Sequence, residues 1–219
     1  MNKEQSVIEF YVLCNKLKNI VRTGWKDWGV NRERVESIAE HIYGVQMFAI
    51  SMWSEYGYDI DITKVLTMLS IHELEETIIG DLTQFQIDKK KKEEMGHNAI
   101  KKILGKLTQG LSIEQLILEF DERTTPEAKF AYQCDKLECD IQCKIYDEEN
   151  CVDLNNQSSN KTAQNKSVQK LLNDGLTWSE MWMTFGQQKY PYDENFMAVS
   201  NYAMKNPITL NDKETEIVD

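Results

Sequence analysis

Apolar residues recur at three- and four-residue steps in every long segment of this chain, and this spacing constrains the fold more than any other feature. It places them on one face of an α-helix, and no sustained alternation of apolar and polar residues indicates a strand. Only three prolines and ten glycines interrupt 219 residues, of which 41% are hydrophobic, so the chain can bury a substantial core. The sequence therefore predicts an all-α protein with a single domain over residues 1–204.

The periodic segments divide the chain into expected helices and two polar stretches. Residues 150–167 are rich in Asn, Gln, Ser and Lys, which predicts a mobile loop, and residues 205–219 are predicted to form a disordered tail. The helices are expected at about residues 3–19, 35–57, 61–79, 89–107, 111–120, 126–149, 168–185 and 195–204.

Charge and cysteine content exclude several classes of protein. The net charge of −11 argues against a protein that binds duplex nucleic acid by neutralising its phosphates. The longest uncharged apolar segment, Ile42 to Ser54, is too short to span a bilayer, and the N-terminal sequence has no signal-peptide run. Five cysteines without a CxxC pair suggest neither a disulfide framework nor a zinc-thiolate site. We therefore expect a cytoplasmic protein with reduced thiols.

The stretch from Leu69 to Gln84 places ionisable residues where apolar ones are expected. On a helix, His72, Glu73 and Glu76 share the face of Leu69, whose neighbours form a core stripe. Burying an imidazole and carboxylates without a partner is costly, and a divalent cation would remove that cost. The alternative is that the helix reaches the surface here and its acids face water.

Two further helices carry an ionisable residue on an apolar face. His41 lies in the stripe of the second expected helix, and Asp135 lies on the buried side of the helix that Pro126 opens. A lone histidine in such a stripe is usually a core residue hydrogen-bonded to a carbonyl. However, two imidazoles and two carboxylates from three helices suit a hard or borderline divalent cation, which would bind His41, His72, Glu73 and Asp135.

Arg22 and Trp25 lie in a segment that Gly24 and Gly29 remove from the helical period. A guanidinium binds oxyanions through paired hydrogen bonds, and an indole offers a flat face to a nucleobase. The alternative is that the tryptophan fills the edge of the core and the arginine caps a helix.

Together these residues resemble the HD-domain metal-dependent phosphohydrolases, whose signature is a histidine, a later His-Asp pair and a distant Asp. The resemblance is greatest to the subgroup of 5'-deoxynucleotidases and HD-domain-containing protein 2. It covers roughly residues 10–149. The segments that match the family patterns are Arg22 to Trp25, Glu36 to His41, His72 to Asp81, Pro126 to Phe130 and Asp135-Lys136.

The resemblance implies a helical bundle with a metal site between helices and a nucleotide substrate. It implies one divalent metal ion (Mn, Co, Mg, Fe or Zn) and a homodimer. It further implies that Glu76 and Asp81 manage protons and water, that Arg22 binds the phosphate and that Trp25 shapes the nucleoside pocket.

Two positions depart from the family pattern, since Glu73 replaces the Asp of the His-Asp pair and Thr83 follows Leu82 where the family has a Pro. Glutamate is one methylene longer, so it changes the reach of this ligand to the metal. The resemblance therefore favours a 5'-nucleotidase that hydrolyses (deoxy)ribonucleoside 5'-monophosphates. The alternatives are a nucleotide- or partner-binding protein that kept the scaffold and lost activity, and a phosphohydrolase for another nucleotide.

Overall fold

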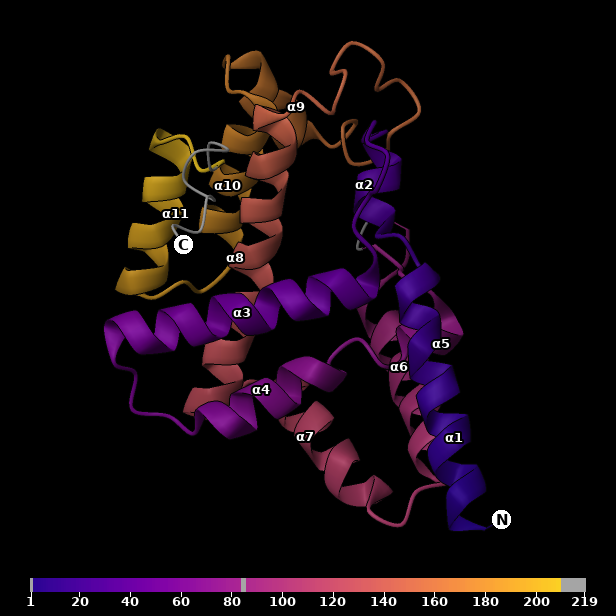
Figure 1. The fold of residues 1–219 in the computed structure, drawn as a ribbon. Coiled ribbons are helices and arrows are strands. Elements are labelled where there is room, and N and C mark those ends of the chain that lie inside the picture. The colour runs from indigo at the N-terminus through magenta and orange to yellow at the C-terminus, as the bar shows by residue number, and fades with distance from the viewer. Residues whose placement is uncertain (1, 84–85, 210–219) are drawn as a thin grey trace, which may run out of the picture.

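A computed structural model describes residues 2–83 and 86–209, and within these ranges the protein is all-helical, as predicted (Figure 1). Their only strand-like pairing is an isolated antiparallel bridge between Val21 and Ser37. The helices are α1 (Lys3–Cys14, followed by a 3-10 turn, Asn15–Asn19), α2 (Thr23–Asp27), α3 (Ile38–Tyr56), α4 (Ile62–Ile71), α5 (Glu76–Ile79), α6 (Lys89–Leu104), α7 (Gly110–Glu122), α8 (Pro126–Glu148), α9 (Lys166–Asn173), α10 (Trp178–Lys189) and α11 (Glu194–Lys205).

The long helix α8 is the centre of the arrangement, with α3, α4, α7, α10 and α11 packed around it. Figure 1 shows α3 crossing α8 at a steep angle. Thr125 caps α8 and Pro126 occupies its first turn, where a missing backbone N–H costs nothing. Its buried residues include Phe130, Ala131, Cys134 and Leu137, which join the largest apolar cluster together with residues of α3, α4 and α11. Asp135 therefore sits on a helix that is held rigidly from several sides.

A second apolar cluster is formed largely by aromatic side chains of α2, α8 and α10. Trp25, Trp28 and Trp178 are almost completely buried in it, and Tyr146 of α8 packs edge-on to Trp25 at a ring-centroid distance of 5.3 Å. Such aromatic packing stabilises beyond the area it buries. It fixes the segment that carries Arg22 against α8 and α10.

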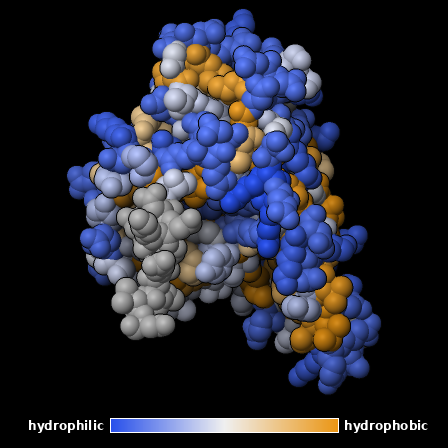
Figure 2. Space-filling model, turned by 45° about the horizontal axis from the view of Figure 1, so that its top comes forward, coloured by the Kyte–Doolittle hydropathy of each residue, from blue (hydrophilic) through white to orange (hydrophobic). Residues whose placement is uncertain are grey.

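The N-terminal helix differs from its prediction in both length and burial. A single helix to residue 19 was expected, but α1 ends at Cys14 and contains no buried residue. Val7 and Tyr11, which repeat at helical spacing in this segment, are each 61% exposed. Of the residues of α1, Phe10, Leu13 and Cys14 pack against a third apolar cluster, which is formed by Leu74 and by residues of α6 and α7. Figure 2 accordingly shows hydrophobic side chains gathered over the end of the molecule where α1 lies.

The polar stretch at 150–167 consists of turns up to the start of α9. Gln157 donates its side-chain N–H to the carbonyl of Trp28 at 3.0 Å, and Ala163 is buried in the aromatic cluster. At the C-terminal end, the backbone N–H groups of Ile208 and Thr209 donate to the Glu148 carboxylate. The rest of the predicted tail, residues 210–219, lies outside the described residues.

The length and hydropathy of each helix show whether it could cross a membrane. Within the described ranges, none of the helices has both the length and the apolar character that crossing a bilayer requires.

Candidate metal centre and active site

His41 lies in the first turn of α3, where a capping box fixes the start of the helix. The Ser37 side chain accepts from the backbone N–H of Glu40, and the Glu40 carboxylate accepts from the backbone N–H of Ser37 at 2.8 Å. The backbone N–H of Ile38 also donates to the carbonyl of Ile20 at 2.8 Å. These contacts hold the end of α3 in place and direct His41 toward α8.

His72 and Glu73 occupy a break between two helices, whereas the sequence predicted one continuous helix through this region. That prediction is wrong, because α4 ends at Ile71 and residues 72–75 form turns. The backbone N–H of Leu74 donates to the carbonyl of Ile71 at 3.0 Å, and that of Glu76 to the carbonyl of Glu73 at 3.1 Å. These i to i+3 bonds wind the chain more tightly than an α-helix, so neighbouring side chains can face one site.

Glu75 also lies in this break, immediately before α5. Glu75 is half-buried in the pocket wall, and its Cγ would lie 3.3 Å from a Cβ at position 96. Gly96 therefore leaves room for the side chain. Burial and the charge of Glu73 raise the pKa of Glu75 to about 8.

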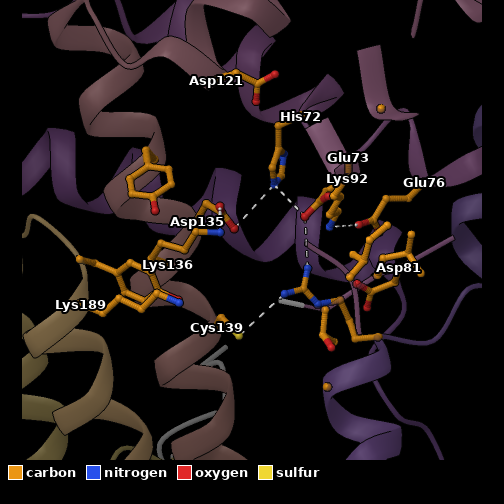
Figure 3. Close-up of a pocket in the computed structure, with 18 of the residues that line it drawn as sticks. His72, Glu73, Glu76, Asp81, Lys92, Asp121, Asp135, Lys136, Cys139 and Lys189 are labelled. Carbon is orange, nitrogen blue, oxygen red and sulfur yellow. Dashed lines mark hydrogen bonds and ion pairs between the residues drawn. The ribbon is translucent and has the colours of Figure 1, made fainter. Parts of the chain in front are cut away.

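The structure brings the four predicted metal ligands together. One donor atom from each of His41, His72, Glu73 and Asp135 lies within 4.8 Å of all the others. Asp135 Oδ1 is 3.2 Å from His41 Nε2 and 3.8 Å from His72 Nε2, and Glu73 Oε1 is 3.6 Å from His72 Nε2. In Figure 3 the side chains of His72, Glu73 and Asp135 point toward one another.

Hydrogen bonds on the far side of each imidazole test whether this donor set fits a cation. His72 Nδ1 donates to the carbonyl oxygen of Leu69 at 2.8 Å, which leaves the Nε2 lone pair directed into the cluster. That Nε2 is buried and has no hydrogen-bond partner among the described residues. His41 Nδ1 is bonded to Glu138 Oε2 at 2.7 Å, so its Nε2 also faces the cluster. Two imidazole nitrogens and two carboxylates thus fit a divalent cation.

The charges in the cluster agree with this assignment. Burial and Arg22 disfavour a charged His41, but Glu138 and Asp135 outweigh them and raise its pKa to about 9. Burial opposes ionisation of Glu73, yet His72 and Arg22 lower its pKa to about 2. The Glu73 carboxylate is therefore ionised and able to bind a cation. Binding of the cation at His41 would displace the proton from its Nε2.

Arg22 lies beside the cluster and joins it to α8. Its Nη1 is 3.4 Å from Glu73 Oε1, and its Nη2 donates to Cys139 Sγ at 3.8 Å. The next residue, Thr23, donates its backbone N–H to the Asp81 carboxylate at 2.5 Å. Asp81 thus anchors the segment that carries the arginine.

Glu76 is a buried acid next to the cluster. Lys92 Nζ donates to its Oε1 at 3.3 Å, while its Oε2 has no hydrogen-bond partner among the described residues. Burial, together with the charges of Glu73 and Asp81, raises the pKa of Glu76 well above its ordinary value. A carboxyl group in this environment is suited to carry a proton.

Trp25 is almost completely buried, and its indole Nε1 donates to Glu36 Oε2 at 2.6 Å. Its ring packs against Trp182 at a centroid distance of 5.2 Å. It is part of the wall of the pocket but is too buried to present an open face.

Comparison with known proteins decides the family. A family model described as HD domain matches residues 14–177. The chain belongs to the HD domain family. It is 33% identical over 150 residues to "5'-deoxynucleotidase HDDC2" of Dictyostelium discoideum, an alignment covering 65% of this chain and 78% of that protein. It is 31% identical over 198 residues to "5'-deoxynucleotidase hdd1" of Schizosaccharomyces pombe, covering 85% and 98%. The solved structure of the PH0347 protein from Pyrococcus horikoshii OT3 has a TM-score of 0.67 at 23% identity, covering 90% of this chain and 98% of that one.

The His/Asp/Glu cluster of this HD domain lines a cavity of about 510 Å³ through His72, Glu73 and Asp135. Cationic side chains lie on both sides of the cluster, Lys136 and Lys189 on one and Lys92 on the other (Figure 3). Other parts of the wall are aromatic and are formed by Tyr132, Trp182, Phe185 and Tyr190. The cavity combines a charged centre with flat apolar surfaces, as a site for a small organic anion requires.

Sequence reasoning missed two residues around the HD-domain site. Glu138 received no role, although it lies one helical turn after Asp135, and it bonds His41. Lys92 belongs to a run of four lysines, a pattern typical of a solvated helix start, but it is half-buried and its Nζ donates to Glu76. The position of Lys92 opposite Glu76 depends on how α6 packs against α5, which no local pattern reveals.

Proposed function

We propose that this HD domain is a metal-dependent phosphohydrolase that hydrolyses nucleoside 5'-monophosphates, with deoxynucleotides as its preferred class. The observation that carries the proposal is the convergence of His41, His72, Glu73 and Asp135, the last three of which line a cavity that also holds a buried acid, Glu76. The names of the two relatives support the choice of substrate.

Hydrolysis of a phosphate monoester requires a positioned water, neutralised phosphoryl oxygens and a proton for the leaving alkoxide. A divalent ion held by His41, His72, Glu73 and Asp135 supplies Lewis acidity and lowers the pKa of a bound water. The remaining requirements fall to side chains of the cavity itself.

Arg22 is placed to bind the phosphoryl oxygens, because its guanidinium lies 3.4 Å from the ligand Glu73. Glu76 is the proton carrier in this proposal, since one carboxyl oxygen is buried without a partner in the described chain. Asp81 keeps Arg22 in position through its bond to Thr23 and orders the nearby water. Trp25 shapes the nucleoside pocket indirectly, by supporting Trp182.

The test is an assay of phosphate release from a panel of ribo- and deoxynucleoside monophosphates, diphosphates and triphosphates with Mn²⁺, Co²⁺, Mg²⁺, Fe²⁺ or Zn²⁺. We expect release from at least one deoxynucleoside monophosphate, with a metal-free blank as control. Hydrolysis of triphosphates alone would move the substrate to another nucleotide class. No release from any nucleotide with any of the metals would contradict an enzymatic function.

We also propose that the protein is a homodimer. The uncharged stretch from Ile42 to Ser54 forms most of α3, and Tyr43, Met47 and Ile50 are exposed on it, at 65%, 42% and 38%. Two copies with a net charge of −11 repel each other least where neither carries acids, and a two-fold axis lets the same face meet itself. Light scattering should give twice the monomer mass, and a replacement of Met47 by Glu should halve it. A wild-type protein at monomer mass would contradict the dimer.

A further inference from the structure

Glu138 lies behind the metal cluster, on the side away from the cavity. It belongs to α8, one helical turn beyond Asp135, and its Oε2 accepts from His41 Nδ1 at 2.7 Å. His41 is fully buried, so no water replaces this contact. A histidine whose Nδ1–H is held by a carboxylate presents its Nε2 in a fixed direction.

Gly44 provides the space that this carboxylate occupies. A Cβ at position 44 would overlap Oε1 of Glu138, the oxygen that does not bond His41. The backbone does not require glycine there, because Gly44 lies inside α3 and is not among the glycines with positive φ. Glycine inside a helix costs about 1 kcal/mol relative to alanine. The close approach of Glu138 explains why a small residue is needed.

Glu36 completes a buried group with His41 and Glu138, whose donor atoms lie within 4.8 Å of one another. Each has a short hydrogen bond of its own. The indole of Trp25 donates to Glu36 Oε2 at 2.6 Å, and His41 is bonded to Glu138. These bonds satisfy the group without an ion, so it supports the metal site and is not a second one.

We propose that Glu138 is a positioning residue that orients His41 for metal binding, and that the glycine at position 44 leaves the space for the Glu138 carboxylate. This inference rests on the proposed metal site. Loss of such an outer contact to a ligating histidine weakens metal binding by about 10- to 100-fold. The pairing links the first turn of α3 to the middle of α8, and thus joins two of the segments that supply ligands.

The experiment measures the dissociation constant for Co²⁺ by competition with a chromophoric chelator, together with the visible absorption of the bound cobalt. Glu138→Met removes the acceptor at similar volume, and we expect binding about 10- to 100-fold weaker with an altered cobalt spectrum. Glu138→Gln keeps a carbonyl acceptor and should fall between Met and wild type. Gly44→Ala should weaken binding as Glu138→Met does, and the double variant should be no weaker than either one, because both break the same contact.

Gly186→Ala is the matched control, since a Cβ there would overlap the Asp140 carboxylate in the same way but no histidine is involved. Its cobalt affinity should stay within about twofold of wild type. Glu138→Met also leaves the buried Nδ1–H of His41 without an acceptor, so the metal-free variant should stay folded but melt below the wild-type temperature. Wild-type affinity in Glu138→Met would overturn the inference. A wild-type protein that binds no divalent metal would instead overturn the metal site itself.

Discussion

Replacement of Glu76 by glutamine should lower kcat for phosphate release by about 100-fold or more, while KM and bound metal stay close to wild type. Glutamine keeps the shape of the side chain and can still accept from Lys92, which now donates to Oε1 at 3.3 Å. It cannot exchange a proton with water or a leaving alkoxide. The loss should therefore appear in the chemical step and not in binding, and steady-state kinetics with metal analysis would separate the two.

Glu94→Gln is the control for this substitution, because Glu94 is an exposed residue of α6. It should leave both kinetic constants unchanged. Near wild-type turnover in Glu76→Gln would remove Glu76 from the mechanism and leave Asp81 as the candidate for proton transfer.

A change of His72 to alanine should abolish metal binding and phosphate release together. Its Nδ1 is fixed by the carbonyl of Leu69 at 2.8 Å, so Nε2 has one orientation and faces the other donors. Without His72 the site loses one of its four ligands, and the remaining donors of His41, Glu73 and Asp135 bind the cation more weakly. Metal analysis and the phosphate assay on the same sample measure both effects.

His97→Ala is the matched control for His72→Ala. His97 also lines the cavity, but its Nε2 is bonded to Asp121 at 3.0 Å and it lies outside the ligand group. Metal content should therefore remain at the wild-type value. Full metal content in His72→Ala would show that the ion binds elsewhere.

Helices with strong terminal signals could be predicted closely from the sequence. The bounds of α8 agree within one residue, because Thr125 and Pro126 mark its start and its apolar face is long and regular. α1 could not be predicted as well. Its apolar residues repeat at helical spacing, yet Val7 and Tyr11 are mostly exposed and none of its residues is buried. Periodicity identifies an apolar face but does not show whether a neighbour covers it.

Helical periodicity predicted the residues of the site better than it predicted the backbone that carries them. Isolated ionisable residues on apolar faces pointed to His41 and Asp135, and the structure places both at one cluster. The break after Ile71 was not predictable, because the helical pattern continues through Leu69, His72 and Glu76 in the sequence. The turns bring His72 and Glu73 beside His41 of α3 and Asp135 of α8, which lie far away along the chain.

The central claim is that the cation held by His41, His72, Glu73 and Asp135 is required for phosphate release. The most direct measurement titrates metal-free protein with Mn²⁺ or Co²⁺ and records bound metal and phosphate release from the best deoxynucleoside monophosphate at every step. We expect release to rise in proportion to occupancy and to level off when each chain holds one ion. Full release by the metal-free protein, or saturation of the metal site without any release, would contradict the account.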